Sequence, residues 1–265
     1  MSTAYDVSER ARRFIPAATE LQGRVIAITG AGTGIGRAVA RAAAAHGAQV
    51  ILIGRNVRQL EQVHAEIGQQ QPGSVQIAPL DLERALARDY DQLAEAVQSA
   101  YGRLDGLLHN AAMLGALAPI EHYDVPTWFR VMHVNVTAAF ALTQVLLPAL
   151  RQSADASVIF TSSAAGRRGY AYWGAYAASK FAIEGLSQVL AEELGGSTRV
   201  RVNALNPGRC RTRLRRQAYP SEDLATLPEP ESLVNPYLWL LGAASRGFSG
   251  LSLDAQESYR VAPPG

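Results

Sequence analysis

The sequence has little that could cross-link the chain or bind a metal ion. Cys210 is the only cysteine among its 265 residues, which excludes an internal disulfide and a cysteine-based metal site and is typical of a reducing compartment. The five histidines are scattered without the spacing of metal ligands. We therefore expect no metal site and interpret these histidines as surface or core residues: His46, His64, His109, His122 and His133.

Long apolar runs and a strong charge of one sign are also missing. No apolar run approaches the roughly 20 residues that span a membrane. The N-terminus, with Asp6, Glu9 and Arg10, lacks the apolar centre of a signal peptide. The formal net charge is +2, and hydrophobic residues make up 48% of the chain. This composition predicts a cytoplasmic globular protein with neither a membrane nor a nucleic acid as partner, and one α/β domain can account for its length.

What the sequence does contain is a strand that ends in a cluster of glycines. The apolar, β-branched run that begins at Val25 gives way to Gly30, Gly34 and Gly36, and then to helix-forming residues from Ala38 onward. Glycine allows the positive φ angles of a tight turn and lets a ligand approach the backbone. The helix start adds unpaired N–H groups and the positive end of its dipole, so this pattern favours a bound phosphate group.

The rest of the chain alternates between apolar strand patterns and helical patterns. This alternation predicts a doubly wound α/β fold with a parallel sheet. We interpret residues 1–22, which include a helical pattern around 8–14, as an N-terminal arm and assign no chemistry to them. After the first strand, the predicted strands are 49–53, 75–79, 104–109, 158–160 and 251–253. The predicted helices are 38–46, 57–67, 90–101, 127–150 and 231–241, with another that begins at Tyr176.

The residue after the second strand bears on the choice of cofactor. In a dinucleotide-binding unit, an acidic residue at this point bonds both ribose hydroxyls of NAD and repels the 2′-phosphate of NADP. The sequence instead has Arg55, with no acidic residue before Glu61. A planar guanidinium pairs well with phosphate, and Arg58 or Arg37 could assist, so we expect NADP(H) rather than NAD(H). The alternative is that Arg55 lies in a solvated loop.

Two further strand ends carry residues at the same predicted edge of the sheet. Asp81 follows the third strand, and Asn110, Ala111 and Ala112 follow the fourth. At this edge Asp81 could bond an adenine amine, and the turn at 110–112 could pass beneath a cofactor ribose. Each could instead be a turn-forming residue without a ligand.

The pattern at 127–150 predicts a long helix that is apolar around most of its circumference. Its apolar residues include Trp128, Phe129 and Phe140, and a helix of this kind is buried on several sides. We infer a symmetric subunit interface, and hence a homodimer or homotetramer; the alternative is that an added loop covers the helix. Asn135, a polar residue in this apolar setting, needs hydrogen-bond partners.

Residues with catalytic chemistry lie between positions 158 and 180. A buried strand stops at Thr161, Ser162 and Ser163, which places hydroxyls at the carboxyl edge of the sheet. Tyr176 and Lys180 are four positions apart at the start of the next helix, so they share one helix face. A nearby cation favours the phenolate. Lys180 together with an oxidised nicotinamide is therefore expected to bring the pKa of Tyr176 from about 10 towards neutrality and make it a general acid or base.

Taken together, these residues resemble the short-chain dehydrogenase/reductase family. The resemblance extends from about Gly23 to Gln256, and within the family the chain is most similar to the YciK-type bacterial oxidoreductases, through residues 160–163, 173–181, 238–240 and 253–256. It implies a single Rossmann-type catalytic domain over residues 23–265, with a seven-stranded parallel sheet and a substrate loop at about 209–230. The motifs that carry it are Thr29-Gly30-x-x-x-Gly34-x-Gly36, Asp81, Asn110-Ala111, Asn135, Ser163, Tyr176-x-x-x-Lys180 and Asn206-Pro207-Gly208 followed by Thr212.

The resemblance also implies a role for each matching residue. Ser163, rather than Ser162, would bond the substrate's carbonyl or hydroxyl oxygen, and Tyr176 would exchange a proton with that oxygen. Lys180 would hold the nicotinamide ribose and acidify Tyr176, and Asn135 would bend its helix and position a water of a proton relay. The residues expected to bind the cofactor are Gly30, Thr33, Gly34, Ile35, Gly36, Arg55, Asp81, Leu82, Asn110, Tyr176, Lys180, Pro207, Gly208 and Thr212.

The sequence therefore predicts an NADP(H)-dependent oxidoreductase that interconverts a carbonyl and an alcohol. Five arginines lead the substrate loop: Arg209, Arg211, Arg213, Arg215 and Arg216. They could attract an anionic substrate or simply form a solvated face.

Three alternative functions remain open. A 3-oxoacyl thioester reductase would use the arginines to dock an acidic carrier. A nucleotide-binding sensor without turnover would have lost Ser163, Tyr176 or Lys180, all of which are present. A methyltransferase would leave the Tyr176–Lys180 pair unexplained.

Overall fold

The chain folds around one parallel β-sheet in a computed structural model that describes residues 3–257. In that range seven strands pair in the order β3-β2-β1-β4-β5-β6-β7, and every pairing is parallel. The predicted seven-stranded parallel sheet is thus confirmed. The strands are β1 Val25–Thr29, β2 Gln49–Gly54, β3 Val75–Pro79, β4 Gly106–His109, β5 Ala156–Thr161, β6 Val200–Asn206 and β7 Ser252–Asp254.

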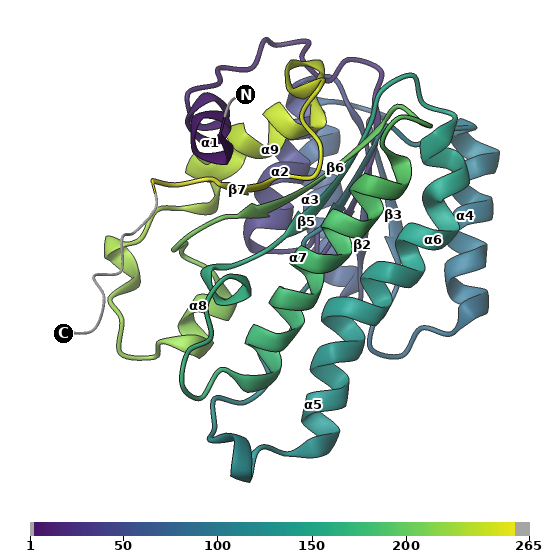
Figure 1. Ribbon diagram of the computed structural model, residues 1–265. Helices are drawn as coiled ribbons and strands as arrows, with labels where there is room; N and C mark the ends of the chain where they lie inside the picture. Colours follow the sequence, from purple (N-terminus) through teal and green to yellow (C-terminus); the bar gives the residue numbers. More distant parts are fainter. Residues whose placement is uncertain (1–2, 258–265) are drawn as a thin grey trace.

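Helices cover both faces of the sheet, as a doubly wound fold requires (Figure 1). They are α1 Ala4–Arg12, α2 Gly34–Ala45, α3 Val57–Gln70, α4 Ala87–Tyr101, α5 Val125–Met132, α6 Ala138–Arg151, α7 Gly174–Leu194, α8 Arg213–Ala218 and α9 Val234–Leu241. Short helical turns are η1 Ile120–His122, η2 His133–Thr137, η3 Ala164–Gly166, η4 Leu224–Thr226, η5 Pro230–Leu233 and η6 Ala243–Ser245.

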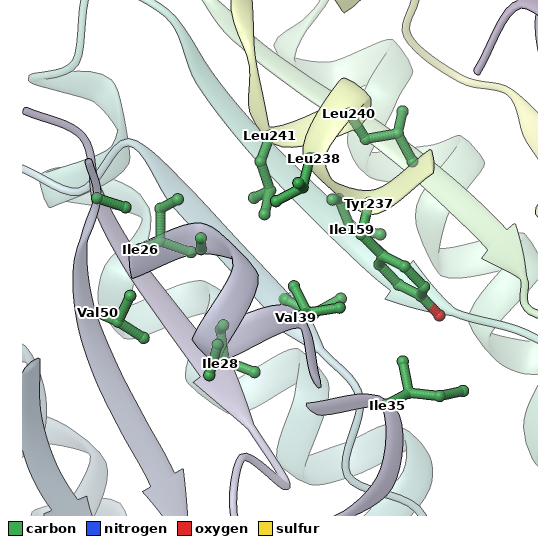
Figure 2. Close-up of a cluster of buried hydrophobic side chains, with 14 of the residues drawn as sticks. Ile26, Ile28, Ile35, Val39, Val50, Ile159, Tyr237, Leu238, Leu240 and Leu241 are labelled. Atoms are coloured by element: carbon green, nitrogen blue, oxygen red, sulfur yellow. The ribbon is translucent and has the colours of Figure 1, made fainter. Parts of the chain in front are cut away.

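The hydrophobic core forms two layers, one on each face of the sheet. Successive side chains of a strand point to opposite faces, so in β1 Ile26 and Ile28 join one layer while Val25 and Ala27 join the other. The first layer lies under α1, α2, α3 and α9, and Figure 2 shows residues of α9 over β1 and α2. The second lies under α4, α6 and α7. All five residues of β1 are buried, which explains its uninterrupted apolar run.

The long apolar helix is divided by an irregular segment. The sequence predicts one helix over 127–150, whereas the structure has α5, a π-helical segment at His133–Thr137 and then α6. Asn135 lies in the π segment, where an extra residue widens the turn. The division agrees with the expectation that Asn135 disturbs its helix.

This same stretch passes a simple composition test for a membrane span. By length and apolarity Val125–Arg151 could cross a membrane, so the expectation that no apolar run approaches that length does not hold on composition alone. The finding is weak evidence for a membrane segment, because the core helix of a soluble protein passes the same test. Here Leu142, Leu146 and Leu150 of α6 are fully buried in the second core layer.

The N-terminal helix covers the last helix of the fold. α1 packs against α9 and against the edge strand β7, and Tyr237, Trp239 and Leu240 are all buried. α2 also packs against α9, so this helix lies in the interior of the fold.

Candidate active site

The glycine turn between β1 and α2 has the geometry of a phosphate site. Gly30 and Gly34 have φ angles of +66° and +53°, in the left-handed region where other residues are strained. A Cβ atom at Gly36 would collide with the carbonyl oxygen of Gly30, so only glycine allows this close packing. Thr33 precedes α2 without a side-chain capping bond, which leaves the first helix amides available to an anion. Ile35 beside them is buried.

Arg55 lies immediately after β2, at the carboxyl edge of the sheet. Its guanidinium is largely exposed, and its Nη1 atom lies 3.2 Å from Oε2 of Glu83. Of the two arginines expected to assist it, Arg37 is paired with Glu66 at 2.6 Å, whereas Arg58 is exposed. Arg55 therefore lies where the 2′-phosphate of an adenosine ribose is expected, oriented by a carboxylate that the sequence analysis had not considered.

Thr29 holds the neighbouring strand ends together. Its hydroxyl accepts hydrogen bonds from the backbone amides of Asn110 at 2.9 Å and Ala111 at 3.0 Å, and the side-chain amide of Asn110 donates to the Thr29 carbonyl. Asp81 uses one carboxylate oxygen to accept the Glu83 amide, 3.1 Å away. These bonds fix the turns after β1, β3 and β4 along one crevice.

Leu82 lines a space between these turns and α7. It is buried and faces the same small cavity as Thr29, Asn135 and Lys180. The cofactor residues expected after β1, β3 and β4 thus lie along one edge of the sheet, at the point where the strand order reverses.

The hydroxyl, the phenol and the amine expected to be catalytic meet at the end of β5. A hydrogen bond links the side chains of Ser163 and Tyr176. The Nζ atom of Lys180 lies 5.6 Å from the centroid of the Tyr176 ring and donates to the carbonyl of Thr161 at 2.7 Å. Tyr176 and Lys180 are almost fully buried. The structure therefore brings together the three residues that the sequence grouped.

Burial dominates the titration of this pair. Desolvation raises the pKa of Tyr176 to about 12, although its hydrogen bond with Ser163 acts in the opposite direction. Desolvation also lowers the pKa of Lys180 to about 8, against the attraction of Glu184. The sequence analysis predicted that Lys180 together with an oxidised nicotinamide lowers the pKa of Tyr176, and for the cofactor-bound protein this stays a prediction. In the protein by itself, burial of the phenol dominates and raises the pKa.

Asn135 has the hydrogen-bond partners that its apolar setting demanded. Its Oδ1 atom accepts from the Met113 amide at 2.7 Å, and its Nδ2 atom donates to the Met113 carbonyl and to the Ser179 hydroxyl, each at 2.9 Å. Ser179 is adjacent to Lys180. Asn135 therefore fastens the π segment to α7 and to the segment that follows β4.

The start of the predicted substrate loop lies against the glycine turn. Gly208 has a φ angle of +75°, and its amide donates to Oδ1 of Asn206. The side chain of Gln256 donates to the carbonyls of Pro207 and Arg209, at 2.7 and 2.6 Å. Thr212 caps α8, and its methyl group lies 3.4 Å from the point where a Cβ of Gly34 would be.

Comparison with known proteins agrees with this geometry. Residues 24–223 match the family model described as short chain dehydrogenase. The chain is 48% identical over 236 residues to the uncharacterized oxidoreductase YciK of Escherichia coli K12, covering 89% of this chain and 93% of that protein. The chain belongs to the short-chain dehydrogenase family. It is accordingly an oxidoreductase of a family that uses a nicotinamide cofactor.

Solved structures of similar short-chain dehydrogenases have the same fold. One from Pseudomonas syringae is 50% identical, with a TM-score of 0.89, over 92% of this chain and 98% of that one. Another, from Escherichia coli CFT073, was solved in complex with NADPH. It is 48% identical, with a TM-score of 0.88, over 91% of this chain and all of that one.

Most arginines of the predicted substrate loop of this short-chain dehydrogenase are paired with carboxylates. Arg209 and Arg215 both bond the carboxylate of Glu222, and Arg211 pairs with Glu229. Arg213 and Arg216 are exposed. The run is therefore largely a set of loop-stabilising ion pairs, which the sequence analysis missed because the carboxylates lie several residues further along the chain.

The face of Tyr176 away from the sheet is covered by apolar and aromatic side chains. The Trp173 ring makes an edge contact with the Tyr176 ring, with 5.7 Å between the ring centroids. Its centroid also lies 5.7 Å from that of Tyr219. The surrounding cluster also contains Leu114, Ala165, Ala177, Ala218, Tyr170 and Leu214. These side chains exclude water from the phenol, which accounts for the raised pKa of Tyr176.

Proposed function

We propose that this protein is an NADP(H)-dependent oxidoreductase that interconverts a carbonyl group and an alcohol. The observation that carries the proposal is the meeting of Ser163, Tyr176 and Lys180 at the carboxyl edge of the sheet, beside the glycine turn. A bound nicotinamide supplies or accepts the hydride. Everything else in the reaction falls to side chains of this chain.

Ser163 and Tyr176 hold the substrate oxygen between their hydroxyl groups. In reduction Tyr176 donates its proton to this oxygen as negative charge develops there, and in oxidation it removes the proton from the alcohol. Donors fixed at such a point contribute a few kcal/mol each to the transition state. The hydrogen bond between the two hydroxyls supports this arrangement.

Lys180 and Asn135 support the proton transfer from the other side of the phenol. The ammonium group of Lys180 favours the charged form of Tyr176 and bonds the nicotinamide ribose. Asn135 lies beside Lys180 through its bond with Ser179 and links this region to the backbone at Met113. It is proposed to position a water between Lys180 and solvent.

NADP(H) is the proposed cofactor, held along the crevice between β1 and β4. Gly30, Thr33, Gly34, Ile35 and Gly36 would hold the phosphates, and Arg55 would pair with the 2′-phosphate. Asp81, Leu82 and Asn110 would hold the adenine and its ribose, and Pro207, Gly208 and Thr212 would hold the nicotinamide end. The NADPH complex of the similar Escherichia coli structure and the lack of an acidic residue after β2 support this preference.

A homo-oligomer is the proposed assembly. Large apolar side chains remain exposed on three helices of one face, although the chain has a core of its own. They are Val125 and Phe129 of α5, Phe140 of α6, and Phe181 and Val189 of α7, each at least 45% exposed. α5 packs against α7, and Figure 1 shows α6 beside α7. A second copy of the chain would remove this apolar surface from water.

The test is a panel of ketones, aldehydes and acyl thioesters, assayed with NADPH and NADH in parallel. We expect turnover of ketones or aldehydes with NADPH preferred. Turnover of 3-oxoacyl thioesters alone would favour the thioester reductase, and tight NADPH binding without turnover of any class would favour the sensor. A clear preference for NADH would refute the role of Arg55.

A further inference from the structure

Glu184 is a buried carboxylate next to the proposed catalytic residues that the proposed reaction does not use. Its side chain is 10% exposed. It follows Tyr176 and Lys180 on α7 at a spacing of four, so the three side chains lie along one face of the helix. A buried carboxylate carries a large desolvation cost unless it has partners, and its partners connect it to the site.

Three consecutive residues at the end of β5 each contact one of these three side chains. The carbonyl of Thr161 accepts a hydrogen bond from Lys180, the hydroxyl of Ser162 donates to Glu184, and the hydroxyl of Ser163 bonds Tyr176. Strand end and helix are thus joined by three successive contacts. Two of them involve proposed catalytic groups, and the third is the Ser162–Glu184 pair.

Arg167 is a second partner of Glu184. Its Nε atom lies 3.6 Å from Oε1 of Glu184, and its other nitrogens bond Asp254 at 2.7 Å and the Leu253 carbonyl at 2.9 Å. The carboxylate is therefore anchored to β7 as well as to β5. Because Glu184 belongs to α7, these contacts oppose sliding of the helix along the strand.

The charged and titratable groups that face Lys180 come from two elements. α7 contributes Tyr176 and Glu184, and the carboxylate of Glu184 attracts the ammonium group. β4 contributes His109, which lines the same small cavity as Lys180. Burial lowers the pKa of His109 to about 3, so this imidazole is neutral. Arg167 pairs with Glu184.

We propose that Glu184 is a positioning residue of the reaction. Its bond with Ser162 fixes the register of α7 against the end of β5, and its negative charge keeps Lys180 in the ammonium form. This inference rests on the proposed function, because the register matters for the Ser163–Tyr176 pair and the charge matters for proton transfer.

The charge can be tested without a substrate, because Lys180 is the only lysine of the chain. Protein labelled with ¹³C at the lysine ε-carbon gives a single side-chain signal whose pH titration reports this residue alone. An opposite charge stabilises an ammonium group, so Glu184→Gln should lower the titration midpoint by about one pH unit. The matched control is Glu192→Gln, an exposed carboxylate two turns further along α7, which should leave the midpoint unchanged.

The register can be tested by kinetics with the substrate found in the panel. Ser162→Ala removes the hydrogen bond to Glu184 but keeps the charge of Glu184. It should lower kcat roughly ten-fold, about the effect of one lost buried hydrogen bond, and leave KM for NADPH unchanged. Glu184→Gln should lower kcat and also move the alkaline limb of the pH profile to lower pH.

An unchanged Lys180 midpoint in folded Glu184→Gln would overturn the electrostatic role. Wild-type kcat in Ser162→Ala would overturn the positioning role, and this variant carries the test if Glu184→Gln does not fold. Because the titration needs no turnover, it tests the electrostatic role of Glu184 even if no carbonyl compound proves to be a substrate.

Discussion

Ser162 and Ser163 are neighbours with the same hydroxyl group, and their surroundings give them different tasks. Ser162 is buried at 2% exposure and is committed to Glu184. Ser163 is partly exposed and bonds Tyr176. The sequence favoured Ser163 through its distance from Tyr176 in the family resemblance. The structure supplies a physical reason for that choice, because a hydroxyl already donated to a buried carboxylate is not available to a substrate.

Replacing Arg55 should change the choice of cofactor. Arg55→Ala removes a charge-assisted pair with the 2′-phosphate worth roughly 1.5–3 kcal/mol, so KM for NADPH should rise about 10–100-fold. KM for NADH, which has no such phosphate, should stay nearly constant. Steady-state kinetics with both cofactors measures this. Glu83→Gln is the matched control, because it removes the partner that orients Arg55 and keeps the guanidinium. An equal rise of KM for NADPH and for NADH in Arg55→Ala would contradict the assignment.

The reductive reaction should lose activity in alkaline solution. Burial lowers the pKa of Lys180 to about 8, so its ammonium form predominates below that pH and disappears above it. Burial raises the pKa of Tyr176 to about 12, so the phenol remains an acid throughout. The kcat/KM for carbonyl reduction, measured between about pH 6 and 10, should therefore fall above about pH 8. A rate that stays level to the end of this range would show that the Lys180 proton is not needed.

Contacts between residues close together in the sequence could be predicted, whereas contacts between residues far apart in the sequence could not. The i, i+4 spacing was sufficient to pair Tyr176 with Lys180. Nothing local links Gln256 to Pro207, or Ser162 to Glu184, because each contact depends on which strands become neighbours in the sheet. The raised pKa of Tyr176 in the protein by itself could not be predicted either, since burial is a property of the whole fold.

Among the elements, the predicted substrate loop is held together by ion pairs. Glu222 receives Arg209 and Arg215 together, and the hydrogen bond from Arg215 keeps the pKa of Glu222 at about 2. A carboxyl group whose pKa is lowered in the folded protein stabilises that protein at pH values above its ordinary pKa. This stabilisation is lost as the pH falls towards the lowered pKa. The clamp therefore persists throughout the neutral range.

Removing this clamp should expose the loop to proteases. Glu222→Gln takes away the charge that holds two arginines, so trypsin, which cleaves after arginine, should cut the segment 209–216 several-fold faster than in the wild type. Limited proteolysis with mass spectrometry of the fragments measures this, with Glu192→Gln as the control on another exposed surface. Identical cleavage rates in all three proteins would show that Glu222 does not hold the loop.

Most strands and helices could be predicted because each has a clear apolar period. β3 has the predicted bounds, and β2 is one residue longer than predicted. β6 and α8 were missed. β6 contains Arg201 and Asn203, polar residues that are buried only because distant groups such as Asp155 receive them. The π segment in the long helix was also beyond prediction, because an i+5 turn leaves the apolar pattern almost unchanged.

For the whole molecule, the reversal of strand order between β1 and β4 creates the crevice on which the function depends. Strands on either side of such a reversal send their connections to opposite faces, which leaves an opening at their carboxyl ends. The glycine turn, Arg55, Asn110 and the Ser163–Tyr176–Lys180 group all lie along this edge. On the same scale, α1 covers α9, and the apolar side chains of α5, α6 and α7 are left exposed.

Charging this apolar face should break the proposed oligomer. Phe140→Glu and Phe181→Glu place a carboxylate where a second copy would bury an aromatic ring, so light scattering should show the mass falling to that of one chain, 28.4 kDa. Ile15→Glu is the matched control, since Ile15 is 86% exposed and follows α1 rather than belonging to α5, α6 or α7. A wild-type protein that is already monomeric, or charged variants that remain associated, would contradict the proposal.

The central claim is that Tyr176 delivers the proton as hydride reaches the substrate carbonyl. The most direct measurement is single-turnover transfer of deuterium from C4-deuterated NADPH to the best carbonyl substrate, in the wild type and in Tyr176→Phe, with NADPH binding to both proteins checked by fluorescence. We expect deuterium on the alcohol carbon of the wild-type product and a rate lower by about 100- to 10,000-fold in Tyr176→Phe. Equal transfer rates in the two proteins would contradict the claim.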